Sequence, residues 1–95
     1  MREVVKNSYV DYDICYDGTV EIEEIQVAES DRRQGIGSQL VDIVKNFAFE
    51  NNNKNITLIA NPLDYSINQD DLLNFYFENG FDFHHDDSER NYLIY

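Results

Sequence analysis

The stretch RRQGIGSQLV, residues 32–41, places two arginines and two glycines directly before an apolar helical pattern. Glycine lets the backbone adopt left-handed angles and pass closely beneath a ligand. The unpaired N–H groups and the positive dipole end of a following helix bind phosphate well, and two guanidinium groups add full positive charge. The stretch therefore predicts a phosphate-binding loop, although glycine at a helix start can equally serve a simple turn.

Neither of two common nucleotide-binding loops fits this glycine spacing. The dinucleotide fingerprint needs GxGxxG and the P-loop ends in Gly-Lys-Ser/Thr, whereas this loop has the pattern RxxGxG. Nicotinamide cofactors and nucleoside triphosphates are therefore disfavoured as ligands.

The chain after the loop predicts a helix, a central strand, a second helix and a last hairpin. Apolar residues recur at helical spacing over 35–51, and the short apolar run 56–60 is typical of a strand covered on both faces. A strand-helix-strand crossover makes that strand parallel to the one before the loop. The second helix ends before a glycine, over 68–79, and the hairpin pairs 81–85 with 92–95.

Residues 8–27, before the loop, predict a β-hairpin. Apolar and acidic residues alternate along both halves, and Asp17-Gly18 supplies a two-residue turn. The alternation slips at Glu23-Glu24, where one extra residue indicates a β-bulge. A kinked strand thus leads straight into the arginine and glycine loop.

Length and composition indicate one small acidic domain. The 95 residues are 42% hydrophobic, enough for a single core, and the single cysteine excludes an internal disulfide. The N-terminus shows no leader or membrane pattern, so a cytoplasmic location is predicted. A net charge of −12 argues against direct nucleic-acid binding. Residues 32–54 nevertheless carry +2 and the rest −14, so positive charge gathers at the loop.

The order of these features resembles the GNAT (Gcn5-related N-acetyltransferase) family. A bulged strand, the RxxGxG loop, an amphipathic helix, an apolar strand and the motif FYFENGF over 75–81 follow one another at the family's spacing, within residues 19–83. The resemblance implies a single N-acetyltransferase domain over residues 1–95. Its fold class would be α/β (α+β), a minimal GNAT fold with a mixed, mostly antiparallel sheet and two helices. The implied cofactor is acetyl-CoA, or coenzyme A.

The resemblance also implies roles for particular residues. In the family the bulge separates two strands so that pantetheine lies between them, which here implicates the backbone of Ile25, Gln26 and Val27. Tyr76 would contact the coenzyme and protonate the departing thiolate, unless it is simply one more core aromatic. The residues implied to hold the coenzyme A pyrophosphate are Arg32, Arg33, Gln34, Gly35, Ile36, Gly37 and Ser38.

The implied mechanism needs a base for the acceptor amine. A neutral amine attacks the thioester carbonyl, backbone amides stabilise the oxyanion, and a carboxylate accepts the amine proton directly or through water. Glu21, Glu23 and Glu24 all lie on the kinked strand. Glu23 is favoured because it flanks the bulge where the acceptor would arrive, and Glu24 is the second choice, although most acidic residues on a strand are merely solvated.

Two features depart from the family pattern. The N-terminal strand and helices that usually precede the hairpin are expected to be missing, because only about 18 residues precede its turn. The acceptor side should then be open, which suits a lysine protruding from a large protein. Gln69 and Leu72 replace the Asn and Ala that often precede the helical tyrosine, so contacts from this helix to pantetheine are in question.

Over nearly the whole chain, the sequence is more closely similar to short acetyltransferase-type anti-CRISPR proteins of type V systems. RRQGIGSQLVDIVK, SINQDDLLNFYFEN and the acidic tail carry this resemblance. The resemblance implies a protein partner with a basic surface, namely a CRISPR effector nuclease. The lysine with which that nuclease reads its DNA motif would be acetylated. The acidic charge of the present chain would steer it toward such a basic surface. Two alternatives are a non-catalytic acidic binder that occludes a basic nucleic-acid-binding site and an acetyltransferase for small amines.

Three other features favour structural roles. The run HHDD at residues 84–87 is disfavoured as a metal site, because adjacent strand residues face opposite sides. The aspartates that precede Gly18 lack EF-hand spacing, and Cys15 has no base nearby in the sequence. No metal site and no membrane association are predicted, and the oligomeric state is left open.

Overall fold

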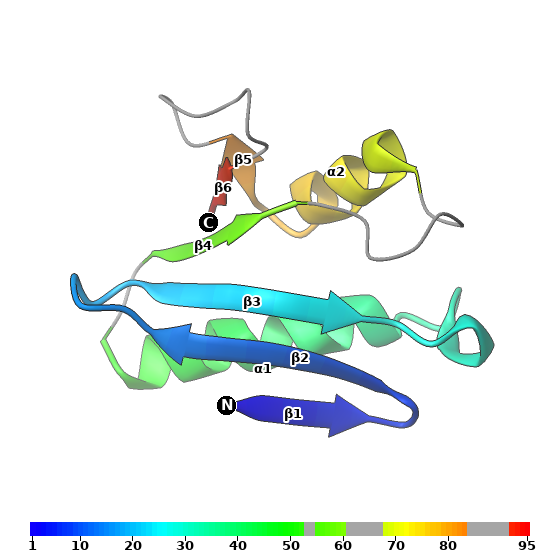
Figure 1. Ribbon diagram of the computed structural model, residues 1–95, viewed down its shortest axis with the longest axis horizontal. Coiled ribbons are helices and arrows are strands. Elements are labelled where there is room, and N and C mark those ends of the chain that lie inside the picture. The colour runs from blue at the N-terminus through cyan, green and yellow to red at the C-terminus, as the bar shows by residue number, and fades with distance from the viewer. Residues whose placement is uncertain (53–54, 61–67, 84–91) are drawn as a thin grey trace.

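The chain folds into one mixed sheet with two helices, as shown by a computed structural model that describes residues 1–52, 55–60, 68–83 and 92–95 (Figure 1). The strand order is β1-β2-β3-β4-β6-β5, with β3 parallel to β4 and the other described pairs antiparallel. The predicted class is thus confirmed. The elements are β1 (Arg2–Val5), β2 (Ser8–Ile14), β3 (Val20–Gln26), the 3-10 turn η1 (Glu29–Asp31), α1 (Ile36–Glu50), β4 (Ile56–Ile59), α2 (Gln69–Glu78), β5 (Asp82–Phe83) and β6 (Tyr92–Ile94).

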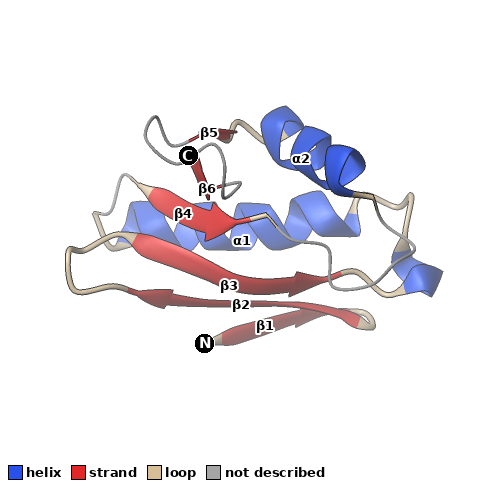
Figure 2. Ribbon diagram, turned by 45° about the horizontal axis from the view of Figure 1, so that its top comes forward, coloured by secondary structure: helices blue, strands red, loops and turns tan. Residues whose placement is uncertain are grey.

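Helix α1 covers one face of the sheet. Figure 1 shows it behind β2 and β3, and Figure 2 shows α2 on the β4 side of the molecule. The core lies between α1 and the sheet, where Leu40 and Val44 of the helix meet Val10 and Val20 of the strands, all fully buried. The predicted apolar stripe of this helix is confirmed. Among the described residues, no helix is long and apolar enough to cross a bilayer.

Strands β2 and β3 form the predicted hairpin, but its connection is longer than a two-residue turn. The Cys15 amide donates to the Thr19 carbonyl (2.8 Å) and the Gly18 amide to the Cys15 carbonyl (3.0 Å). Gly18 is left-handed, with φ 86°. The prediction of a two-residue turn is wrong because the Asp17 carboxylate holds the Thr19 amide (3.0 Å), which extends the loop by one residue before the strands pair.

The β-bulge predicted at Glu23-Glu24 is confirmed. Asp11 pairs with Glu24 but Tyr12 pairs with Ile22, so Glu23 is the extra residue. An extra residue bends the strand and shifts its side-chain alternation by one. Apolar side chains on both sides of the bulge consequently face α1.

A short strand, β1, precedes the predicted hairpin at residues for which the sequence predicted no element. β1 pairs with β2 along its whole length through a turn in which Lys6 is left-handed, with φ 54°. The strand shows no apolar alternation and is mostly exposed, so its sequence carries no strand signal. Pairing with β2 creates it, supported by the ion pair between Arg2 and Asp11 (2.7 Å). No helix precedes β2, as expected.

Strands β3 and β4 separate soon after they meet. In the described part of the chain their parallel pairing is limited to Val20 with Ile56 and Glu21 with Thr57, while β3 continues for five more residues. Figure 1 shows the two strands diverging toward their carboxyl ends. Because β3 has moved away, Ile59 at the end of β4 is 53% exposed. The expectation that this strand is covered on both faces is therefore wrong at its last residue.

The ends of α2 match their sequence signals. The Asn68 side chain accepts from the Asp71 amide (2.8 Å) at the start. At the end, Gly80 is left-handed (φ 93°), its amide donates to Phe77, and the Phe81 amide donates to the Tyr76 carbonyl (3.0 Å). This Schellman arrangement brings the Phe81 ring against Tyr76, with ring centres 5.6 Å apart. The helix cap thus fixes Tyr76.

We expect Gly80→Ala to destabilise the protein by about 1–2 kcal/mol, because alanine resists the left-handed angle. The added Cβ would also lie 2.9 Å from the Tyr95 ring. The melting temperature, measured by thermal unfolding, should fall by about 4–8 °C for each kcal/mol of lost stability. Gly35→Ala is the control, since Gly35 is also left-handed (φ 74°) but has open space around its Cβ position. Equal losses would show that the Tyr95 contact is unimportant.

The C-terminal residues form the predicted antiparallel pair. β5 pairs with β6, and β6 also pairs with β4, which completes the sheet. The run HHDD at 84–87 lies outside the described residues. In the described part, no three His, Cys, Asp or Glu side chains come together as metal ligands.

Candidate functional site

A groove of about 320 Å³ lies between the end of β3, the start of α1 and the helix α2. Eight of the residues predicted to bind the cofactor line it: Ile25, Val27, Arg32, Arg33, Gly35, Ile36, Gly37 and Ser38. Four further lining residues were not predicted as cofactor contacts: Asp31, Asp71, Leu72 and Phe75. The arginine and glycine loop and the bulged strand therefore contribute to one site.

The start of α1 forms one end of the groove. Its N-cap, Gly35, is left-handed and has no side chain to cap the helix. The first-turn N–H groups of a helix lack partners within the helix, and the helix dipole makes this end positive. A Cβ at Gly35 would meet nothing within 4 Å, so space is open there for a ligand. With Arg32 and Arg33 on the same wall, this end of the groove can bind an anion.

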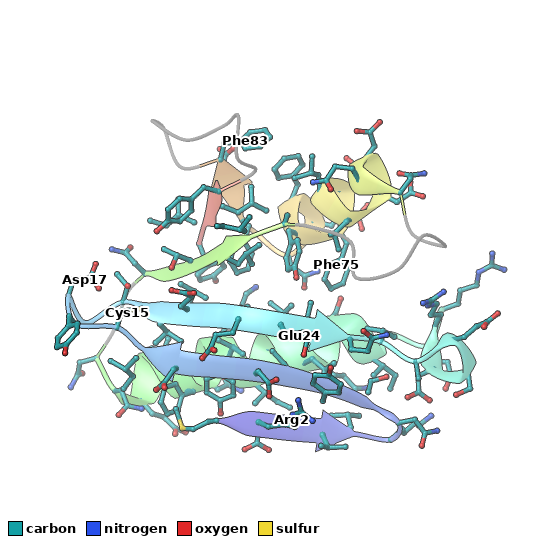
Figure 3. All side chains as sticks on the ribbon, viewed as in Figure 1. Arg2, Cys15, Asp17, Glu24, Phe75 and Phe83 are labelled. Carbon is teal, nitrogen blue, oxygen red and sulfur yellow. The ribbon has the colours of Figure 1, made fainter. Side chains whose placement is uncertain are left out.

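Helix α2 supplies the apolar wall of the groove. Figure 3 shows Phe75 directed from α2 toward the side where β3 ends. A Cβ at Gly37 would lie 3.0 Å from the Phe75 ring and 3.4 Å from Val27, so this glycine lets α1 and α2 approach closely. The spacing of Asp71, Leu72 and Phe75, one helical face, is the sequence signal that could have located this wall.

Two of the predicted loop and strand residues do not line the groove. Gln34 accepts from the Lys6 ammonium (2.7 Å) and donates to the Ser30 carbonyl (2.8 Å). Gln26 pairs with Tyr9, on the face of β3 opposite Ile25. Both therefore sit beside the groove, where their backbones shape the loop and the strand.

Tyr76 is 3% exposed and lies behind the groove wall, packed between the rings of Phe75 and Phe81. In the described part of the chain its hydroxyl has no hydrogen-bond partner. Burial raises the pKa of this hydroxyl above its ordinary value of 10. The phenol therefore holds its proton at all physiological pH values.

The three candidate glutamates occupy different environments. Glu23 is the exposed bulge residue, and Glu24 accepts a hydrogen bond from the Tyr9 hydroxyl (2.7 Å). Glu21 instead lines a small cavity of about 110 Å³, where β3 and β4 begin to separate. Thr57 and Tyr92 line this cavity too. The sequence favoured the two glutamates at the bulge because they flank it. The point at which β3 separates from β4 could not be predicted from the sequence of one strand.

Cys15 lies near Glu21 without the features of a nucleophile. Its thiol is 3.5 Å from the Glu21 carboxylate. Partial burial raises the pKa of the thiol; a hydrogen bond with Thr19 lowers it, and the neighbouring Glu21 raises it again. The thiol therefore stays protonated at neutral pH.

The donor groups of the groove fit coenzyme A. Its pyrophosphate needs N–H groups and positive charge, which the first turn of α1 and the two arginines offer. Its pantetheine arm needs a partly apolar slot, and Ile25, Val27 and Phe75 line one.

Comparison with known proteins agrees with this geometry. The family model "Acetyltransferase (GNAT) family" matches residues 8–81. A crystal structure of the anti-CRISPR protein AcrVA5 is 40% identical, covers 100% of this chain and 96% of its own, and has a TM-score of 0.90. A search of curated proteins gave no match.

Two larger proteins share the fold at low identity. Ard1 from Thermoplasma volcanium is 20% identical over 93% of this chain and 61% of its own, with a TM-score of 0.68. A PaiA N-acetyltransferase from Thermoplasma acidophilum, solved with coenzyme A, is 14% identical over 92% of this chain and 50% of its own, with a TM-score of 0.69. Since the family model spans most of the chain and the fold agrees, the chain belongs to the GNAT family of acetyl-CoA-dependent acetyltransferases.

Proposed function

We propose that this protein acetylates a lysine side chain of a CRISPR effector nuclease of a type V system, at the lysine that reads the target-adjacent DNA motif. The observation that carries the proposal is the similarity to the anti-CRISPR protein AcrVA5, which is 40% identical over the full chain. The groove at the start of α1 supports an acetyl-CoA-dependent reaction.

The binding residues would hold the cofactor by complementary chemistry. Acetyl-CoA supplies the acetyl group as an activated thioester. Arg32, Arg33 and the first-turn amides of α1 hold the pyrophosphate, and the backbone of Ile25 to Val27 faces the pantetheine arm. Leu72 and Phe75 exclude water from the groove wall, so Leu72 serves as an apolar contact in place of the smaller residue common in the family.

Tyr76 is proposed as the general acid. Burial raises the pKa of the phenol, so the free enzyme carries the proton that the departing thiolate has to receive. The lack of a hydrogen-bond partner for the hydroxyl within the described residues supports this role, because the proton is not committed elsewhere.

Glu21 is proposed as the carboxylate that accepts the amine proton. The cavity beside Glu21, at the separation of β3 and β4, supports it over the bulge residues Glu23 and Glu24. A general base must lie within reach of the acceptor, and Glu21 lies beside the point where β3 and β4 separate.

We expect Glu21→Gln to lower kcat by about 100-fold, within the usual range for loss of a general base. Coenzyme A affinity, measured by calorimetry, should not change. Glu23→Gln and Glu24→Gln are matched controls, because each removes a carboxylate from the same strand. A larger loss in either control would transfer the role to that residue.

The open sheet face supports a protein acceptor. Figure 1 shows no described element in front of β1, β2 and β3, on the side opposite α1. Asp11, Asp13, Glu21 and Glu24 share this face by the strand register, and Arg2 on it is paired with Asp11. A basic protein surface would complement this acidic face.

The proposal is tested by incubating the protein with acetyl-CoA and a type V effector nuclease and mapping acetyl-lysine by mass spectrometry. We expect a single modified lysine in the DNA-motif-reading region and loss of DNA cleavage. Nuclease inhibition without acetyl-CoA, or inhibition without acetyl-lysine, would instead support an acidic binder that occludes the nucleic-acid site. Turnover on a free polyamine or aminoglycoside but not on the nuclease would show a small-amine acceptor.

A further inference from the structure

The turn between β1 and β2 is hydrogen bonded to the loop that leads into α1. The Asp31 carboxylate accepts from the Asn7 amide (2.9 Å) and from the Ser8 hydroxyl (2.7 Å). The Ser8 hydroxyl oxygen in turn accepts from the Ala28 amide (2.9 Å). Three hydrogen bonds therefore join the N-terminal turn to the first half of the loop.

A second connection joins the same turn to the end of the loop. The Lys6 ammonium donates to the Gln34 side-chain carbonyl (2.7 Å), and the Gln34 amide group donates to the Ser30 carbonyl (2.8 Å). The two connections bracket residues 28–34, the segment that carries both arginines of the groove.

The first connection is buried. Ser8 is fully buried and Asp31 is 3% exposed. Asp31 also lines the anion-binding end of the groove, where a negative charge opposes an anionic ligand. A buried carboxylate beside an anion site is unfavourable for ligand binding, so we expect its hydrogen bonds to serve the structure of the loop. Within the described residues, this carboxylate accepts its hydrogen bonds from Asn7 and Ser8 at the β1–β2 turn.

The backbone at the two ends of these connections is strained. Lys6 and Arg33 are non-glycine residues in the left-handed region, with φ of 54° and 64°. Such angles are costly and persist where surrounding contacts impose them. The angle of Arg33 sets the direction of its side chain, so contacts that hold this backbone also orient the guanidinium.

We infer that the β1–β2 turn is a positioning element for the cofactor loop, with Ser8 and Asp31 as its central positioning residues. The inference rests on the assignment of the groove as the coenzyme site. It gives the short, exposed strand β1 a purpose, because pairing with β2 holds the turn where Asn7 and Ser8 meet Asp31.

The test is Ser8→Ala, which removes the bridging hydroxyl without touching the groove. In the cofactor-free protein, hydrogen exchange of residues 28–38 should become about tenfold faster while the β2–β3 hairpin exchanges as before. The Kd for coenzyme A by calorimetry and the KM for acetyl-CoA should rise roughly tenfold, with kcat unchanged, because a displaced loop loses charge-assisted contacts. Ile56→Val, a mildly destabilised core variant away from the loop, is the control and should leave both readouts unchanged.

Unchanged exchange and unchanged Kd in folded Ser8→Ala would overturn the inference. If Ser8→Ala does not fold, the exposed variant Lys6→Met removes the bond to Gln34, and an unchanged Kd there would overturn it equally. The Arg32→Ala, Arg33→Ala double variant separates the two ideas. Loss of coenzyme A binding in this double variant but not in Ser8→Ala rejects the positioning role alone, while normal binding in the double variant rejects the groove as the coenzyme site.

Discussion

The double variant Arg32→Ala, Arg33→Ala is expected to weaken coenzyme A binding by about 100-fold or more. Each charge-assisted hydrogen bond to a phosphate contributes about 1.5–3 kcal/mol, and about 1.4 kcal/mol corresponds to a tenfold change. Both arginines line the groove beside the uncapped start of α1. Isothermal titration with coenzyme A measures the loss directly, and the KM for acetyl-CoA should rise in parallel.

Two comparisons make this result specific. Arg2→Ala also removes an arginine, but Arg2 is paired with Asp11 on the open sheet face, so coenzyme A affinity should not change. Dephospho-coenzyme A lacks the 3′-phosphate but retains the pyrophosphate. The double substitution should therefore weaken the binding of dephospho-coenzyme A by the same factor as the binding of coenzyme A. A loss with coenzyme A but not with dephospho-coenzyme A would place the arginines at the 3′-phosphate instead.

Tyr76→Phe is expected to lower kcat by about 100-fold while coenzyme A binds as before. Loss of a general acid typically costs about 10²–10⁴ in rate. The hydroxyl makes no hydrogen bond within the described residues, so its removal should not destabilise the fold. In the unaltered enzyme, kcat should not fall as pH approaches 10, because burial raises the pKa of this phenol and keeps it protonated.

Tyr12→Phe is the matched control for Tyr76. Tyr12 is also buried, on β2 against α1, and burial likewise raises the pKa of its phenol. It lies outside the groove, so its replacement should leave kcat unchanged. Equal rates in the two variants would mean that Tyr76 is a core aromatic and that another group supplies the proton.

Much of the fold could be predicted because its signals are local. The apolar stripe that defines α1, the phase slip at Glu23 and the stop at Gly80 each depend on residues within a few positions of one another. Elements whose formation depends on a partner were missed or misjudged. β1 exists through pairing with β2, and the exposure of Ile59 follows from the departure of β3.

The candidate site divides in the same way. The loop residues from Arg32 to Ser38 are consecutive, so one stretch of sequence could indicate an anion-binding role for them. The wall formed by Phe75, the cavity beside Glu21 and the bonds from Ser8 to Asp31 join residues far apart in the chain. The spacing of Asp71, Leu72 and Phe75 indicates one face of a helix, but no spacing in the sequence predicts which distant residues meet.

The sequence by itself therefore determined the backbone of the anion-binding loop, the bulge and the limits of both helices. These features depend on the backbone angles of glycine, on helix capping and on the periodicity of the side chains, all of which act over a few residues. The tertiary structure alone decided which side chains meet. The crossover through α1 brings β4 beside β3, and the two strands separate after Glu21 and Thr57. That separation, together with the docking of α2 against Gly37, creates the groove to which the loop contributes its charge.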